Sequence, residues 1–411
     1  MLTRLTFMYV INKNIILVEG AKNAAIYNLN DGNVYSINSV AFNLIKNYIE
    51  KKPITDDTHQ DYLEKLRKHG LISNCFEPQL YSSDIKKEIV LNHAWLELTG
   101  ECNYHCLHCY EGNTHKKSSH ALSENDWIRI LKELKQANCQ SIQFTGGEPC
   151  LNNSFPRILK YASLLGFKKI TVFTNTSLLS EELINLFAGL NITVRFSIYG
   201  HTASVHDNIT QLKGSFEKTV ENVKKMLQHG IAISAAITLM KENEFYLKNI
   251  EYFVSTLGIK HYNIDVIREV YNGTQSRHLP AIPEIKFLRT ITKPNFSITE
   301  ERFKLALSTN TCWYGKFAIS PEGLVFPCIF ERNIILGNLS NQSVNDILES
   351  KELKKCWFLD FSQINDCKVC EYRFACKDCR ALGRSKCNNL FDKNPRCLYN
   401  PYTGVWNSPS T

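Results

Sequence analysis

The sequence lacks any apolar stretch long enough to cross a membrane, which argues against a membrane-spanning protein. The apolar run from Leu5 to Ile11 is short and has no small-residue cleavage site after it, so we expect no signal peptide. Blocks of Lys and Arg are also missing, and a net charge of +8 over 411 residues is mild. The charge therefore gives no strong case for nucleic acid. We predict a cytoplasmic protein that binds neither nucleic acid nor a membrane.

Cysteine, in contrast, is plentiful, with 15 residues in the chain. A reducing compartment does not favour a disulfide framework, so clustered thiols there indicate metal ligation. A first group consists of Cys102, Cys106 and Cys109. A late group consists of Cys312, Cys328, Cys367, Cys370, Cys376, Cys379 and Cys397. We interpret the other five as ordinary small apolar residues: Cys75, Cys139, Cys150, Cys356 and Cys387.

The first group forms a CxxxCxxC loop directly after the strand-like run Ala94 to Leu98. Three thiolates are one too few for a cubane [4Fe-4S] cluster, so one iron would stay open and could chelate a small molecule. The competing reading is a zinc knuckle, in which His105 or His108 completes a tetrahedral ligand set.

This loop, with the aromatic Tyr110 after its third cysteine, resembles the cluster loop of the radical S-adenosylmethionine (SAM) superfamily. The resemblance implies a [4Fe-4S] cluster whose open iron takes the amino and carboxylate groups of SAM. One electron from the reduced cluster then cleaves SAM to a 5′-deoxyadenosyl radical, while the protein supplies placement and excludes water.

A second motif supports the resemblance. Thr145-Gly146-Gly147-Glu148-Pro149 follows the second predicted strand, where glycines allow a close backbone approach and a carboxylate can pair with an ammonium group. In the superfamily this motif holds the SAM amino group. A GGEP motif after the second strand, together with CxxxCxxC after the first, favours iron over zinc.

Further residues match family positions that contact the SAM ribose or carboxylate, namely Asn175 in Thr174-Asn175-Thr176 and Ser197 in the fourth strand. Ordinary polar turns are the alternative for both. One departure is Thr210, which stands where many relatives carry an arginine. A carboxylate contact from this segment is therefore in doubt. We assign no catalytic side chain.

A chain of this length suggests two or three domains. Between 92 and 270, strand and helix patterns alternate in six βα-type units, which predicts an α/β fold with a parallel sheet and active loops at the carboxyl ends of the strands. The resemblance implies a partial (β/α)6 TIM-like barrel for this radical SAM core. Residues 271–310, with Pro280, Pro283 and Pro294, are predicted to form a linker.

Residues 1–85 combine strand-like runs with two helical patterns, which indicates a small winged-helix-like α+β module. It resembles the peptide-recognition element fused to many radical SAM enzymes that modify ribosomally made peptides. Such elements bind a leader peptide as an added strand at the sheet edge. A structural cap without a ligand is the alternative.

The late cysteines, in residues 311–411, resemble the SPASM extension, which carries up to two auxiliary [4Fe-4S] clusters. The resemblance assigns Cys312, Cys328 and Cys379 to one cluster. It assigns Cys367, Cys370, Cys376 and Cys397 to the other. The last gap is two residues where three is usual, and the first cluster lacks a clear fourth cysteine. Two four-cysteine zinc ribbons are the alternative.

Together these features predict a radical SAM/SPASM maturase that modifies a ribosomally synthesised peptide by hydrogen abstraction. Its product would be a thioether or another side-chain cross-link. The expected partners are the precursor peptide, an electron donor such as flavodoxin or ferredoxin, and an ATP-grasp enzyme. The alternatives are an anaerobic sulfatase-maturing, formylglycine-forming enzyme and a non-catalytic zinc- or cluster-binding protein.

Overall fold

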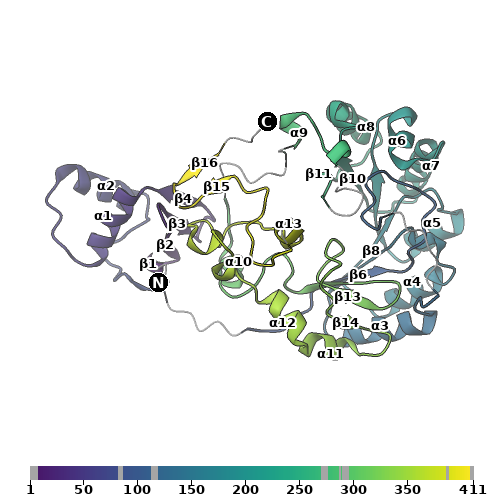
Figure 1. Cartoon of the computed structure of the whole chain (residues 1–411), viewed down its shortest axis with the longest axis horizontal. Helices are drawn as coiled ribbons and strands as arrows, with labels where there is room; N and C mark the ends of the chain where they lie inside the picture. The colour runs from purple at the N-terminus through teal and green to yellow at the C-terminus, as the bar shows by residue number, and fades with distance from the viewer. Residues whose placement is uncertain are drawn as a thin grey trace. The chain divides into compact units, whose positions relative to one another are not determined.

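The structure is a computed structural model that describes residues 8–81, 87–112, 119–269, 276–286, 288, 296–385 and 388–407. The chain forms two compact units, each built from separate segments (Figure 1). The first consists of Met1–Glu88, Thr290–Cys312 and Trp357–Ser410, and the second of Ile89–Arg289 and Trp313–Cys356. Cys387, the start of the run from Leu5 and part of the predicted linker lie outside the described residues. The domain limits expected from the sequence remain a prediction.

The second unit contains a parallel sheet of six strands in chain order. They are β6 (His93–Glu97), β7 (Ser141–Thr145), β8 (Lys169–Thr174), β9 (Thr193–Ile198), β10 (Ile233–Leu239) and β11 (Tyr262–Val266). Neighbours pair in parallel throughout, for example Leu96 with Phe144. Parallel strands end at the same edge, so the loops after them meet there. The predicted α/β class with a partial barrel is confirmed.

Helices alternate with these strands and lie along the outer side of the sheet (Figure 1). They are α3 (Glu124–Gln136), α4 (Phe155–Leu164), α5 (Glu181–Gly189), α6 (Ala203–Thr210), α7 (Ser215–Gln228) and α8 (Leu247–Thr256). Short turns of helix are η1 (Pro149–Leu151), η2 (Glu244–Tyr246), η4 (Ser276–His278) and α9 (Pro283–Lys286). Helix α3 is capped by Ser123, which forms a capping box with Asp126. Its apolar face, including Trp127 and Leu131, is buried.

The segment after Trp313 extends this sheet beyond β6. Strand β12 (Lys316–Ile319) pairs in parallel with β6, and β13 (Leu324–Phe326) and β14 (Gly337–Asn338) continue in antiparallel fashion. Helices α11 (Val344–Glu349) and α12 (Lys351–Trp357) follow. The first part of the cysteine-rich region is therefore continuous with the barrel sheet.

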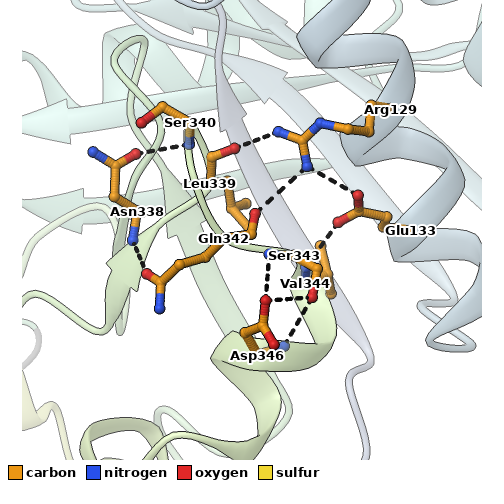
Figure 2. Close-up of polar contacts among 9 residues, drawn as sticks. All are labelled: Arg129, Glu133, Asn338, Leu339, Ser340, Gln342, Ser343, Val344 and Asp346. Atoms are coloured by element: carbon orange, nitrogen blue, oxygen red, sulfur yellow. Dashed lines mark hydrogen bonds and ion pairs between the residues drawn. The ribbon is translucent and has the colours of Figure 1, made fainter.

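Helix α3 fixes this extension by polar contacts (Figure 2). Arg129 donates to the carbonyl oxygens of Leu339 and Gln342 and to Glu133, the last at 2.9 Å. Glu133 in turn accepts from the backbone N–H of Val344 at 2.8 Å. The loop between β14 and α11 is thus held by groups more than 200 positions away in the sequence.

The first unit contains an antiparallel sheet of order β4-β3-β2-β1-β5. Its strands are β1 (Met8–Asn12), β2 (Ile15–Glu19), β3 (Ala24–Asn28), β4 (Val34–Ile37) and β5 (Gln79–Leu80). Helices α1 (Ser39–Ile49) and α2 (Asp57–Lys68) follow β4, as the sequence predicted, whereas β5 was not expected. The other elements are α10 (Glu300–Ala306), η5 (Phe361–Gln363), η6 (Cys367–Val369), α13 (Arg380–Ser385), β15 (Tyr399–Asn400) and β16 (Val405–Trp406).

Both faces of this sheet are covered, so β2 and β3 are buried almost throughout. Leu17 and Ile26 face a core with α1 and α2. Val18 and Tyr27 face the other core, which contains Phe303 of α10 and side chains of the late region. The Tyr27 hydroxyl donates to the carbonyl of Glu371 at 2.7 Å. The amino-terminal sheet and the late cysteine-rich segment therefore share one core.

No helix among the described ranges combines the length and apolar character that a membrane crossing requires.

Candidate active site

A cavity of about 450 Å³ opens inside the sheet of the second unit. The predicted site residues that line it are Cys102, Cys106, Cys109, Tyr110, Thr145, Gly146, Gly147, Asn175 and Ser197. Glu148 and Pro149 are not among the described residues that line it. The volume lies in the range of small-molecule sites in proteins. The loops after the first four strands of this sheet thus meet around one space.

The two glycines are required by the close approach of the loops after β6 and β7. The backbone N–H of Gly147 donates to the carbonyl of Thr99, and that of Glu148 to the carbonyl of Glu101, both at 2.8 Å. A Cβ on residue 147 would lie 2.1 Å from the Glu101 oxygen. Gly146 has a φ of +132°, which side-chain-bearing residues rarely adopt. Glycine here fixes the segment that leads into Cys102.

The other side of the cysteine loop is held by the end of α6. The N–H groups of His105 and Leu107 donate to the carbonyls of Thr210 and Ile209, each at 3.0 Å. The hydroxyl of Thr210 lies 2.7 Å from that of Ser215, so its side chain is buried and partnered. Thr210, which replaces the expected arginine, therefore has a structural role.

Glu148 lies behind the cavity wall. Its carboxylate accepts from the Thr174 hydroxyl at 2.7 Å and from the backbone N–H of Asn175 at 2.8 Å. Burial nevertheless raises the pKa of Glu148. Cys150 donates its N–H to the same carboxylate at 3.2 Å. The predicted contact of Glu148 with an ammonium group stays a prediction.

The three loop thiols influence one another. Burial is the main cause that raises the pKa of Cys102 to about 12, and the Cys109 charge adds to it. Burial also raises the pKa of Cys106, helped by the charges of the other two. Within the described ranges, no three His, Cys, Asp or Glu side chains are gathered closely enough to hold a single metal ion. A cationic centre would reverse the thiol pKa shifts, because a coordinating thiol is deprotonated. The donor set fits an iron–sulfur cluster.

Asn175 and Thr176 form a tight turn beside this loop. The Asn175 amide donates to Asn103 at 2.8 Å and lies 4.0 Å from the Cys102 sulfur. Thr176 has a φ of 68°, unusual for a β-branched residue, and Asn222 of α7 donates to its carbonyl at 2.7 Å. Such strain persists where surrounding structure enforces it, commonly at functional sites.

His108, named above only as a possible zinc ligand in the zinc-knuckle alternative, is a residue of this site. It lines the cavity, and its ring centroid lies 4.7 Å from that of Tyr199. Burial lowers its pKa to about 4, with a smaller effect of His278. Its Nδ1 has no hydrogen-bond partner among the described residues. The signal for His108 in the sequence was its position between Cys106 and Cys109.

The sequence also did not predict an ionic network beside the cavity. Arg332 donates from Nη2 to both Glu97, at the end of β6, and Glu111, two residues after Cys109. Glu97 is 1% exposed. Burial raises its pKa to about 8, although the Arg332 charge opposes this. Since the partners are 235 and 221 residues apart, no local pattern could pair them.

Four late cysteines approach one another in the first unit: Cys367, Cys370, Cys376 and Cys397. Burial raises the pKa of Cys367 to about 12, and the charges of Asp378 and Cys397 add to it. Cys312 and Cys379 belong to the same unit and Cys328 to the other. Cys356, interpreted above as an ordinary apolar residue, has its pKa raised to about 12 by burial and by Glu331, with a smaller contribution from Cys328.

The fold and the cavity together define an iron–sulfur enzyme of the α/β partial-barrel class, with a cysteine loop at the carboxyl end of its first barrel strand. The radical SAM superfamily model matches residues 96–253, and an iron–sulfur cluster-binding domain model, SPASM, matches residues 312–380. The chain therefore contains a radical SAM domain followed by a SPASM domain. Its cofactors are SAM and [4Fe-4S], with auxiliary clusters in the SPASM domain.

Known proteins support this placement. The AdoMet-dependent heme synthase of Methanosarcina barkeri is 24% identical over 75% of this chain and 96% of that protein. The subtilosin biosynthesis protein AlbA of Bacillus subtilis is 28% identical over 64% of this chain and 61% of its own length. The crystal structure of Streptococcus suis SuiB bound to its precursor peptide SuiA has a TM-score of 0.60. That match, at 14% identity, covers 94% of this chain and 99% of SuiB, and shows a shared fold.

Proposed function

We propose that this enzyme modifies a ribosomally synthesised peptide by hydrogen abstraction and forms a thioether or another side-chain cross-link. The observation that carries the proposal is the cavity, which brings three cysteine thiols and the glycine loop together. AlbA is named for subtilosin biosynthesis, and SuiB is seen with a precursor peptide. The fold match to SuiB extends over most of the chain, which favours a peptide substrate.

In this proposal Cys102, Cys106 and Cys109 hold the cluster that binds SAM. The bound cofactors supply a 5′-deoxyadenosyl radical that can abstract hydrogen. The chain's own residues shape the space around it. Gly146 and Gly147 bring backbone to the cavity wall, and polar groups come from Asn175, directly after β8, and from Ser197 of β9. Apolar side chains such as Phe173, Ile237 and Phe330 form part of the lining and would limit the access of water to the reacting groups.

The late cysteines would hold auxiliary clusters in the grouping that the resemblance implies. Cys367, Cys370, Cys376 and Cys397 form one set, and their mutual effect on pKa supports it. Cys312, Cys328 and Cys379 would form the other set, as the resemblance implies. Such clusters would accept an electron from the substrate or hold a substrate thiolate.

The amino-terminal module would bind the leader peptide at a sheet edge. Strand β4 is an outer strand of its sheet, and Tyr35 on it is 40% exposed. An added strand gains main-chain hydrogen bonds at such an edge. We further propose a cytoplasmic location, an electron donor such as flavodoxin or ferredoxin, and cooperation with an ATP-grasp enzyme.

A second candidate is heme synthesis, because the chain covers 96% of the Methanosarcina barkeri heme synthase. Incubation of reduced enzyme and SAM with Fe-coproporphyrin III separates the two functions. Heme formation would support the second candidate and count against a peptide substrate.

The direct test is co-expression with each short peptide encoded beside the gene, followed by mass spectrometry. The proposal predicts loss of two hydrogens from one peptide and no change when the Cys102→Ala enzyme is used. The same peptide without its amino-terminal part should react far more slowly. Unaltered mass for every neighbouring peptide, with active SAM cleavage, would contradict the proposal.

A further inference from the structure

An arginine inside the barrel has no counter-charge among the residues that the structure describes. Arg195 lies on β9 two residues before Ser197, and both side chains line the cavity because alternate strand residues share a face. Its guanidinium carbon lies 5.6 Å from the centroid of the Phe173 ring. Its Nε is buried without a hydrogen-bond partner, and no ion pair within the described ranges includes Arg195.

The other arginines nearby are compensated. Arg268, which also lines the cavity, lies 3.0 Å from the Asp265 carboxylate and stacks on Phe330 at 4.1 Å. Arg332 donates to two glutamates. Among the described residues, Arg195 therefore lacks the ion pair that Arg268 and Arg332 both have.

A buried N–H donor without a partner is unfavourable, so the Nε of Arg195, on a side chain that lines the cavity, is best explained by a ligand that accepts a hydrogen bond from it. The planar set of N–H donors of a guanidinium matches a carboxylate, which it can bind through two parallel hydrogen bonds. We infer that Arg195 binds a carboxylate group of a ligand in this cavity.

Two ligands of the proposed function, on which this inference rests, carry such a group. SAM has a methionine carboxylate, and the arginine expected near residue 210 is replaced by Thr210, whose hydroxyl is already engaged with Ser215. A peptide substrate has acidic side chains. The chemistry at Arg195 is the same in both cases, so the experiment must separate the sources.

The test compares wild type with Arg195→Gln, which removes the charge, and Arg195→Lys, which keeps it. Arg157→Gln is the matched control, since Arg157 is exposed and pairs with Glu124. Anaerobic calorimetry with reconstituted protein measures binding of S-adenosylhomocysteine and of methylthioadenosine, which lacks the amino acid part. The same titrations use capped Gly-Glu-Gly and Gly-Gln-Gly tripeptides.

Arg195→Gln should weaken the binding of one of the two carboxylate-bearing ligands by about tenfold or more. Arg195→Lys should restore part of the lost affinity. Weaker S-adenosylhomocysteine with unchanged methylthioadenosine assigns the carboxylate to SAM. Loss of preference for the glutamate tripeptide assigns it to the substrate. If wild type holds a cluster and cleaves SAM but both ligand pairs are unaffected by Arg195→Gln, the carboxylate inference is overturned alone. Wild type without an iron–sulfur cluster would instead overturn the proposed function.

Discussion

Single residues decide how closely the loops of this site approach each other. The contact of Gly147 with the Glu101 carbonyl leaves no space for a side chain, whereas Gly189 in α5 has open space around it. An added methyl group would thus meet backbone at Gly147 and open space at Gly189. This difference gives a matched pair of substitutions.

Gly147→Ala should displace the segment that leads into Cys102. We expect a loss of about 1–3 kcal/mol in unfolding free energy from the clash and weaker SAM binding. Gly189→Ala should be neutral or stabilising, because alanine favours a helix. Chemical denaturation and SAM titration of both variants check this. Equal behaviour of the two would show that the close approach is unimportant.

His206 connects stability to pH. It is 1% exposed, and its Nδ1 accepts from the backbone N–H of Tyr199 at 3.2 Å. Burial lowers its pKa to about 4, although neighbouring Asp207 opposes this. Since the unfolded chain binds the proton more readily, stability is complete above about pH 6.5 and is lost as the pH falls toward 4.

His206→Gln, which keeps an acceptor for Tyr199, should remove about 2 kcal/mol of the stability difference between about pH 7.5 and about pH 5. Guanidinium denaturation at the two pH values measures this. His69→Gln, at an exposed position, serves as the control. An unchanged pH dependence in His206→Gln would contradict the buried neutral state.

At the scale of elements, Arg332 connects three segments: the end of β6, the residues after the cysteine loop and the stretch after Cys328. Its side chain is 11% exposed, and that of Glu97 is 1% exposed. Removing one partner of a buried pair leaves the other without compensation.

Arg332→Met should therefore lower the unfolding free energy by about 3–5 kcal/mol. Arg157→Met, which breaks an exposed pair with Glu124, should cost less than about 1 kcal/mol. Denaturation midpoints of both variants give the comparison. Similar small losses would show that the network contributes little to stability.

Elements were largely predictable because their signals are local. The helix that begins at Glu124 has its cap and its apolar face in one short stretch of sequence. The close spacing of Cys102, Cys106 and Cys109 likewise predicted that they share one loop. Strand β5 was missed because two residues give no periodicity. The role of Thr210 was not predictable either, since its backbone carbonyl, available from any residue type, holds the loop.

At the scale of the whole molecule, the two compact units interleave along the chain. The sequence predicted a separate amino-terminal module, but one face of its sheet packs against the late region, as Tyr27 and Glu371 show. Such a contact joins residues 344 positions apart, so neither segment by itself identifies its partner. The hint in the sequence was the run of apolar residues in β2, which do not alternate with polar ones. Such a run is expected of a strand that is buried on both faces.

The central claim is that Cys102, Cys106 and Cys109 hold a cluster that cleaves SAM. The measurement that tests it most directly is iron, sulfide and zinc content of anaerobically reconstituted protein, with 5′-deoxyadenosine formation after reduction. The triple alanine variant of these cysteines should lose one cluster, about four iron and four sulfide ions, and all deoxyadenosine, while the late cysteines keep theirs. Full iron content and undiminished deoxyadenosine in the variant, or zinc without iron in wild type, would contradict the account.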